Sequence, residues 1–407
     1  MRNHHLHADL LTIHRPDRSW LARLLRGVVN RFLLLPLGAL FALLWANTAP
    51  EEYFRFAHAN AFWVNEIAMA FFLALIAQEL YEALMRGGEL SHWHHWGLSV
   101  IAAAGGLAGA ITAYWFYIDF NGQLMLASAW PVAAAVDLAA GYYVMRLIYP
   151  RRTAPVAFVL LLAVIIDAVA MIAVTVAHAD LRLHASGLFA VGIAIAAAAV
   201  MRMARVRTFV PYVLCAASVW FGFYSLGIHP ALAFIPIVPF LPHEVRRREV
   251  FAAPPEDDDV HMVENAWNAW AQIALFMFGL VNAGVIVRHV DTGSWAVLFA
   301  AIVGRPAGIL IAVSLALAAG LTLPRKMRFG DLVVAALATT SGFTFALFLG
   351  TAALPAGAVS QQVTLGALAT AAGALLTIGV ARAIGVGRHQ HARGEHGVPS
   401  EAHSPAR

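Results

Sequence analysis

Long apolar stretches recur along almost the whole chain and limit its fold more than any other feature. Each holds about 20 residues, the length that an α-helix needs to cross a hydrocarbon core of roughly 30 Å. Only helices and closed barrels satisfy their backbone hydrogen bonds inside a bilayer, and the alternation of barrel strands is missing here. The sequence therefore predicts an all-α integral membrane protein with about twelve transmembrane helices. The expected spans are 30–47, 61–85, 96–117, 126–147, 154–178, 185–201, 208–224, 228–243, 265–287, 294–318, 330–352 and 361–385.

Composition excludes a water-soluble protein. Hydrophobic residues make up 61% of the chain and charged residues 12%, whereas soluble domains carry roughly 25% charged residues. The basic residues lie in short clusters between apolar runs, so the expected partner is a lipid bilayer and not nucleic acid. The single cysteine, Cys215, excludes an intramolecular disulfide and a thiolate metal site. Neither a cofactor nor an enzyme active site is expected, because no hydrolase, zinc, phosphate-loop or dinucleotide motif occurs.

Charged residues also predict the orientation and the division of the chain. Arg and Lys gather in alternate loops. Because cytoplasmic loops carry an excess of these residues, the pattern predicts twelve spans with both termini in the cytoplasm. Residues 1–29 lack a secretory signal and are expected to form a cytoplasmic segment. Residues 30–387 are expected to form the transmembrane domain, with an acidic internal loop at 244–264. The His-rich tail, 388–407, is expected to be disordered.

Two spans carry features that interrupt a transmembrane helix. Pro131 lies in the span 126–147, and the polar residues Thr340, Gly342 and Thr344 lie in the middle of the span 330–352. Many transporters pair inverted repeats whose broken helices meet near the middle of the membrane. We therefore expect these four residues to line two unwound helices, each in the middle of a trio of spans.

Three ionisable residues fall in the middle of spans, where a charge costs about 2.5–3.5 kcal/mol on insertion scales. They are Asp137, Asp167 and Arg305. Asp167 has two alternatives that the sequence leaves open: a permanent ion pair with Arg305, or a titrating role in cation binding. Asp137 is expected to compensate the exposed N–H groups of a broken helix.

A second set of titratable residues lies near the ends of spans. Glutamates at such positions reach water by snorkelling, so a solvated role competes with a functional one. Histidine changes its charge near neutral pH. The candidates for pH sensing are Glu79, Glu82, Glu264 and His229.

Seven segments, in this order and spacing, resemble the NhaA family of bacterial sodium/proton antiporters. They are WVNEIAMAFF (63–72), WPVAAAVDLA (130–139), AVIIDA (163–168), GIHPALA (227–233), VNAGV (281–285), VGRPAGI (303–309) and SGFTF (341–345). The resemblance implies twelve helices, the fourth and eleventh unwound and crossing at mid-membrane, in a bacterial inner membrane. It also implies exchange of Na⁺ or Li⁺ for H⁺ and a possible homodimer, which in the family forms through a β-hairpin after the first span; here residues 48–60 leave little room for one.

The family's functional residues carry over only in part. The resemblance places the fourth-helix aspartate on Asp137 and the first aspartate of the fifth-helix pair on Asp167. The second aspartate of that pair falls on Ala168, and the tenth-helix lysine falls on Arg305. One carboxylate exchanges one proton per cation, so we expect altered, electroneutral exchange or none. An anion or other solute carrier, and a non-transporting sensor or scaffold, are the alternatives on the same fold.

Overall fold

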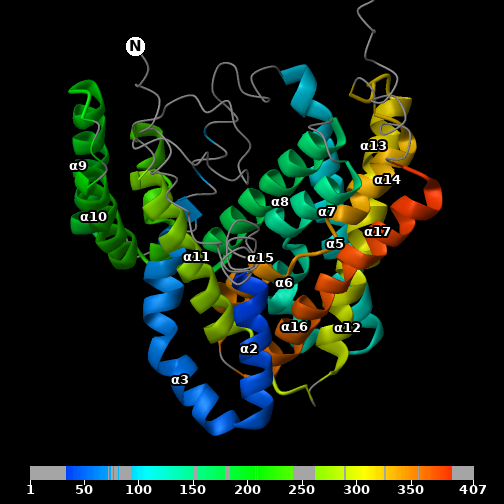
Figure 1. Ribbon diagram of the computed structural model, residues 1–407, viewed down its shortest axis with the longest axis horizontal. Coiled ribbons are helices and arrows are strands. Elements are labelled where there is room, and N and C mark those ends of the chain that lie inside the picture. The colour runs from blue at the N-terminus through cyan, green and yellow to red at the C-terminus, as the bar shows by residue number, and fades with distance from the viewer. Residues whose placement is uncertain are drawn as a thin grey trace, which may run out of the picture.

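Helices account for all the regular structure in the described part of this computed structural model (Figure 1). The structure describes residues 34–71, 93–149, 154–178, 184–206, 210–241, 262–287, 290–324, 327–355 and 357–386, together with residues 73, 74, 77, 81 and 208. The segments 1–29 and 388–407, almost all of the loop 244–264, and both Glu79 and Glu82 lie outside these ranges.

The elements follow the chain in a simple order. The α-helices are α2 (Leu34–Thr48), α3 (Pro50–Phe62), α5 (Trp93–Phe120), α6 (Trp130–Ala134), α7 (Leu138–Ile148), α8 (Ala154–His178), α9 (Ala185–Met203), α10 (Val210–Leu226), α11 (Met262–Asn282), α12 (Thr292–Phe299), α13 (Arg305–Ala318), α14 (Phe329–Ala338), α15 (Phe343–Ala353), α16 (Ala358–Ala369) and α17 (Gly373–Ile384). Two π-helical turns, η1 (Trp63–Ala68) and η7 (Ala300–Gly304), and four 3-10 turns, η2 (Leu124–Ala129), η3 (Pro230–Phe234), η4 (Val238–Phe240) and η8 (Thr370–Ala372), lie between them.

Membrane-spanning length is reached by fewer continuous helices than the sequence predicts. Five helical stretches of the described chain are long and apolar enough to cross a bilayer, and the bent pair α14 and α15 makes a sixth. Several other expected spans hold shorter apolar helices, such as α2, α10 and the second half of α11. The expectation of twelve helices is thus met only in its all-helical character.

The expected span 228–243 differs most from a regular helix. Its described residues form the 3-10 turns η3 and η4 in place of an α-helix. Proline lacks a backbone N–H and clashes with the preceding helical turn. Pro230 and Pro239 each lie in the first turn of one of these short elements, and Pro236 lies between them. The segment is apolar, as the sequence predicts, but its prolines prevent a long α-helix.

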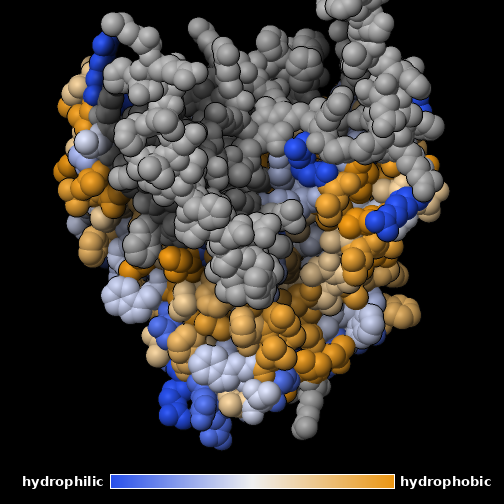
Figure 2. All heavy atoms as spheres, viewed as in Figure 1, coloured by the Kyte–Doolittle hydropathy of each residue, from blue (hydrophilic) through white to orange (hydrophobic). Residues whose placement is uncertain are grey.

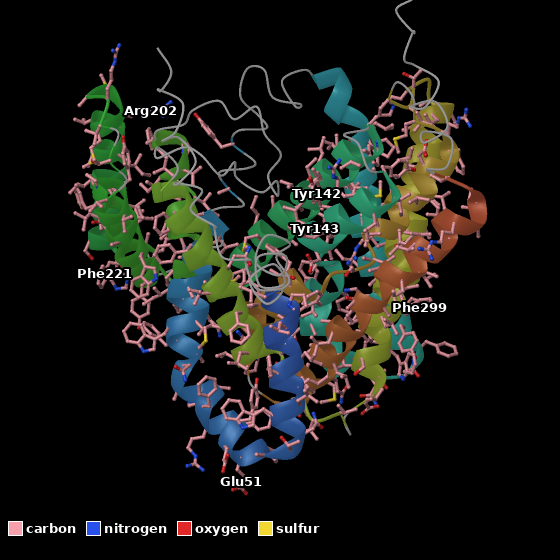
Figure 3. The ribbon with its side chains drawn as sticks, viewed as in Figure 1. Glu51, Tyr142, Tyr143, Arg202, Phe221 and Phe299 are labelled. Atoms are coloured by element: carbon pink, nitrogen blue, oxygen red, sulfur yellow. The ribbon has the colours of Figure 1, made fainter. Side chains whose placement is uncertain are left out.

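Apolar side chains cover much of the outer surface. The described surface visible in Figure 2 is largely hydrophobic, and hydrophilic residues gather at its lower end. Glu51, at the start of α3, lies at that end, and Phe221 on α10 points outward (Figure 3). Further exposed apolar residues are Phe120, Leu147, Phe189, Met203 and Leu375. Such a surface suits contact with lipid tails, since monomeric soluble proteins rarely expose apolar patches of this extent.

Glycines bring α5 unusually close to the η7–α13 segment. A Cβ atom added to Gly105 would collide with the carbonyl of Gly308, and one added to Gly109 would collide with the carbonyl of Gly304. Small residues of this kind allow the backbones of membrane helices to touch. The contact fixes the backbone around Gly304, from which Arg305 extends into the core.

The connection between the first two spans is short. Helix α2 ends at Thr48 and α3 begins at Pro50, and residues 34–71 contain no strand. A β-hairpin of the kind that the resemblance associates with dimers is therefore missing from this connection. The homodimer remains a prediction.

Candidate ion-binding site at two broken helices

Two breaks in transmembrane segments meet near the centre of the molecule. The first separates α6 from α7, where residues 135–137 are extended, and the second separates α14 from α15 with a bend of 42°. The Asp137 N–H donates to the carbonyl of Ser341 at 2.8 Å. Gly342 packs so closely on Ala135 that a Cβ atom there would collide with the Ala135 carbonyl. Helices α6 and α15 accordingly lie side by side (Figure 1).

Pro131 does not cause the first break, contrary to the sequence-based interpretation. It lies in the first turn of α6, and the helix continues to Ala134. The first turn of a helix has no intrahelical partner for its N–H groups, so proline fits there without loss. The break comes later, where Ala135 to Asp137 cross the second broken helix.

Asp137 lies where two helices begin. Its Oδ1 accepts a hydrogen bond from the Ala140 N–H at 2.9 Å, at the start of α7. Its Oδ2 accepts from the Thr344 hydroxyl, and from the Thr344 N–H at 3.4 Å, at the start of α15. The side chain is 2% exposed. A carboxylate in this position opposes the positive ends of both helix dipoles.

Arg305 occupies the complementary position, where two helices end. Its Nη1 donates to the Thr339 carbonyl at 2.6 Å, at the end of α14. Its Nη2 donates to the carbonyls of Ala133 at 2.7 Å and Ala135 at 2.5 Å, at the end of α6. The side chain is 0% exposed. Its positive charge therefore opposes the negative ends of the two helices.

Asp167 on α8 reaches the same crossing from a third segment. Its Oδ1 accepts from the Val136 N–H at 3.0 Å, within the first break, and the residue is 3% exposed. Among the described residues, no ion pair within 4.0 Å joins Asp167 to Arg305, and Oδ2 has no hydrogen-bond partner. The permanent ion pair, one of the two alternatives above, is not formed. The next residue, Ala168, offers only a methyl group.

Threonines of the last span support the second break and were missed in the sequence. The Gly342 N–H donates to Thr370 Oγ1 at 3.1 Å, and the Thr377 hydroxyl donates to the Leu337 carbonyl at 2.9 Å. The break leaves the Gly342 N–H without a helical acceptor, and the Leu337 carbonyl accepts from Thr377 in addition to the Thr340 N–H at 3.0 Å. The spacing of these two threonines, seven residues and thus two helical turns apart, is the signal that could have identified them. Thr340 Oγ1 is buried and has no partner in the described part of the chain.

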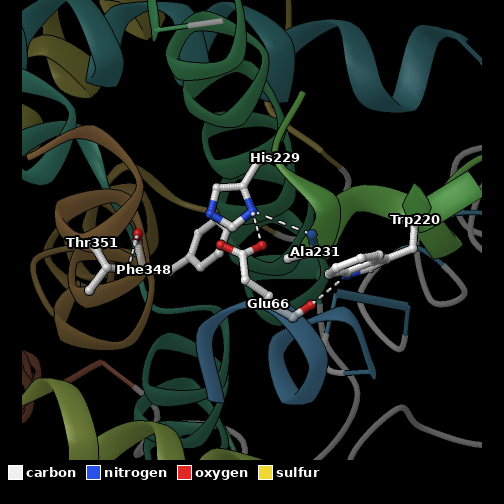
Figure 4. Close-up of polar contacts among 6 residues, drawn as sticks. All are labelled: Glu66, Trp220, His229, Ala231, Phe348 and Thr351. Atoms are coloured by element: carbon white, nitrogen blue, oxygen red, sulfur yellow. Dashed lines mark hydrogen bonds and ion pairs between the residues drawn. The ribbon is translucent and has the colours of Figure 1, made fainter. Parts of the chain in front are cut away.

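The remaining predicted residues lie away from this crossing or are not placed. Glu264 falls in the first turn of α11, and its side chain is not described. His229 lies beside Glu66 of η1, with Nδ1 to Oε2 at 3.6 Å (Figure 4). Glu66 was not among the predicted residues, because its partner lies in a distant span. In the described residues, no cluster of three or more His, Cys, Asp or Glu suits a metal ion.

Comparison with known proteins agrees with this architecture. The sequence profile of the family described as Na⁺/H⁺ antiporter 1 matches residues 24–381. The chain belongs to this antiporter family. The Na⁺/H⁺ antiporter NhaA of Geotalea uraniireducens (strain Rf4) is 32% identical over 368 residues, which cover 87% of this chain and 95% of the relative. NhaA of Geobacter metallireducens (strain ATCC 53774 / DSM 7210 / GS-15) is 34% identical over 357 residues, covering 84% and 93%. NhaA of Desulfitobacterium hafniense (strain DSM 10664 / DCB-2) is 32% identical over 371 residues, covering 86% and 94%.

Family membership gives the crossing a context. The antiporter family supplies transmembrane carriers of ions, which agrees with apolar helices that enclose charged groups. Within that family, this chain has one carboxylate and a methyl group where the resemblance leads one to expect a carboxylate pair at Asp167 and Ala168.

Proposed function

We propose that the chain exchanges Na⁺ or Li⁺ for H⁺ across the bacterial inner membrane, with both termini in the cytoplasm and one proton moved per cation. Names of the relatives support Na⁺ and H⁺, and the clustered arginines support the orientation. The observation that carries the proposal is Asp167: a buried carboxylate at the helix crossing that forms no ion pair with Arg305, whose terminal nitrogens donate to carbonyls instead.

The exchange rests on competition for one carboxylate. A proton or a monovalent cation at Asp167 neutralises the carboxylate. The free-energy cost of exposing this group to the apolar membrane interior during the conformational change is lower for the neutral form than for the charged form. Either occupant therefore permits the change between inward-facing and outward-facing states. Because both forms carry the same charge, the exchange is electroneutral.

Asp137 and Arg305 act as fixed counter-charges in this scheme. Each already has partners at the helix ends, so neither needs to titrate during the cycle. Arginine keeps its proton in proteins, which excludes Arg305 as a proton carrier. The buried Thr340 hydroxyl, which has no partner in the described part of the chain, is an oxygen atom beside the second break that suits a desolvated cation.

The anion-carrier alternative is weaker on geometry. Both terminal nitrogens of Arg305 already donate to carbonyls, and Nε is the one donor nitrogen of the guanidinium without a partner in the described part of the chain. An anion bound by the two-pronged face of the guanidinium would have to displace bonds of a terminal nitrogen and leave buried carbonyls without donors, which is unfavourable. The cation hypothesis needs no such displacement.

The test is cation-driven proton flux in proteoliposomes that contain the purified full chain, between about pH 6 and 9. Na⁺ and Li⁺ should each collapse a pre-formed proton gradient, whereas choline should not. Asp167→Asn should abolish the flux because its amide cannot exchange a proton. Asp119→Asn, which removes an exposed carboxylate on α5, should leave it unchanged. No flux at any pH from correctly folded protein refutes the proposal and favours a sensor or scaffold.

A further inference from the structure

A second pair of titratable side chains lies outside the helix crossing, between η1 and η3. Nδ1 of His229 faces Oε2 of Glu66 at 3.6 Å (Figure 4). That carboxylate oxygen is buried from solvent and has no hydrogen-bond partner in the described part of the chain. Glu66 lies in a π-helical turn, and such turns occur frequently at functional sites.

The two facing atoms are both hydrogen-bond acceptors as they stand. The Ala231 N–H donates to Nδ1 of His229 at 3.3 Å, so this nitrogen acts as an acceptor that caps η3. An ionised carboxylate accepts only. Two acceptors that face each other, one of them shielded from water, repel unless a positive charge lies between them.

In the described part of the chain, no further ionisable side chain contacts this pair. The ring centroids of Phe348 and His229 are 5.3 Å apart. The Trp220 indole N–H donates to the Glu66 backbone carbonyl at 3.3 Å. Helix α15 carries no Asp, Glu, His, Lys or Arg, and the titratable residues of α10 are Tyr212, Cys215 and Tyr224. The other elements against η1 carry Glu51, Glu52, Arg55 and His58, which are exposed on α3, and Glu264 in the first turn of α11.

The geometry favours a proton over a metal cation. Carboxylate, carbonyl and water oxygens are the ligands that hard cations prefer, in sets of about six. This pair supplies one oxygen and one aromatic nitrogen, with an aromatic ring alongside. A shared proton needs only a donor and an acceptor, and a charge-assisted bond of about 2.7–2.9 Å is within a small movement of the two groups.

The pair lies close to the central site along one helix. Phe348 follows Thr344 by four residues on α15, so the two side chains lie on the same face, about 6 Å apart along the axis. Thr344 binds Asp137, and Phe348 contacts His229. A change at the pair is therefore one helical turn from the helix crossing.

We propose that Glu66 and His229 form a second proton-binding site, in which one proton taken from water is shared between Oε2 and Nδ1. With the proton bound, Nδ1–H donates to the carboxylate, or the carboxyl donates to Nδ1, and the pair is neutral. Either arrangement uses the one lone pair of Nδ1, so the 3.3 Å hydrogen bond from the Ala231 N–H is given up when the proton binds. When the proton leaves to water, the pair carries one negative charge. This assignment does not depend on which ion the central carboxylate takes.

The test counts the protons that this pair releases. Purified full-length protein in lipid, without Na⁺, is taken from about pH 5 to 9 while released protons are counted and infrared difference spectra are recorded. The Glu66→Gln/His229→Gln double variant should release one proton fewer than the wild type, because one proton is shared. Each single variant keeps one titratable group, so its carboxyl or imidazole band should titrate with a midpoint different from that of the wild-type pair. Matched controls, Glu52→Gln and His58→Gln, should leave the carboxyl and imidazole bands of the pair intact.

Several outcomes overturn the assignment. If the double variant loses two protons, the groups titrate independently, and if it loses none, the pair binds no proton. If Na⁺ displaces the pair's bands while choline does not, the site takes a metal cation. Should Glu66→Gln fail to fold, Glu66→Asp, whose carboxylate is withdrawn from the imidazole, should separate the midpoints of the carboxyl and imidazole bands. None of these results requires transport, so a failed antiport assay leaves this test intact.

Discussion

Replacing Arg305 by methionine tests how the two broken helices are held. Methionine keeps much of the volume and removes every donor, so three buried carbonyls lose their hydrogen bonds. Each charge-assisted bond contributes about 1.5–3 kcal/mol, offset by the cost of burying the guanidinium. By analogy with buried pairs that lose one partner, the free energy of unfolding should fall by about 3–5 kcal/mol.

Lysine at the same position separates charge from geometry. Arg305→Lys keeps the positive charge, but a single ammonium group cannot reproduce the fork that reaches both helix ends. The loss should be intermediate, on the order of 1–2 kcal/mol. Arg382→Met, at an exposed position near the end of α17, is the matched control and should change nothing measurable.

The assay is reversible unfolding of the purified protein in mixed detergent, followed by circular dichroism. The expected order of stability is wild type and Arg382→Met, then Arg305→Lys, then Arg305→Met. If Arg305→Met is as stable as the wild type, the carbonyls do not depend on the guanidinium. If Arg305→Lys loses as much as Arg305→Met, charge alone contributes nothing at the helix ends.

Three further predictions follow from the site and its packing. Ala168→Asp adds a second carboxylate beside the first, so exchange should become dependent on membrane potential; unchanged electroneutral exchange in proteoliposomes would count against the stoichiometric argument. Thr344→Val removes the hydroxyl that donates to Asp137 and should lower the free energy of unfolding by about 1–2 kcal/mol. Thr344→Ser, which keeps the hydroxyl, should restore it. Gly109→Ala adds a methyl group where the neighbouring backbone leaves no room, and should destabilise by about 1–3 kcal/mol. Gly97→Ala on the same helix meets nothing within 4 Å and should be neutral or stabilising in a thermal melt.

The sequence predicted the broad architecture and the interruption of both spans, but it attributed the first interruption to Pro131. Apolar stretches identify membrane helices because the bilayer demands length and apolarity, and the described chain is all-helical. The polar run around Thr340 and Gly342 located the break between α14 and α15, since glycine and threonines are poor helix formers. The inverted repeat remains a prediction.

The predictions that were wrong concern positions whose structure depends on the place of a proline within a helix. Pro131 was expected to break a helix that it in fact begins. The prolines near Pro230 leave 3-10 turns where a span was expected. Both errors arise because the effect of proline depends on its place within a helix, which the sequence alone does not give.

The sequence also did not predict the partners of the buried charged side chains. Arg305 binds carbonyls at the ends of α6 and α14, which come together only when the two broken helices cross. Glu66 and His229 belong to spans that are far apart in the sequence. Any residue carries a carbonyl, so no pattern of side chains marks these acceptors.

The central claim is that a single carboxylate, Asp167, exchanges one cation for one proton. The most direct measurement compares ²²Na⁺ efflux with proton uptake in the same proteoliposomes, while valinomycin and K⁺ set the membrane potential. The account predicts equal cation and proton fluxes and a rate that does not depend on the potential. More than one proton per Na⁺, with a rate that follows the potential, would contradict it.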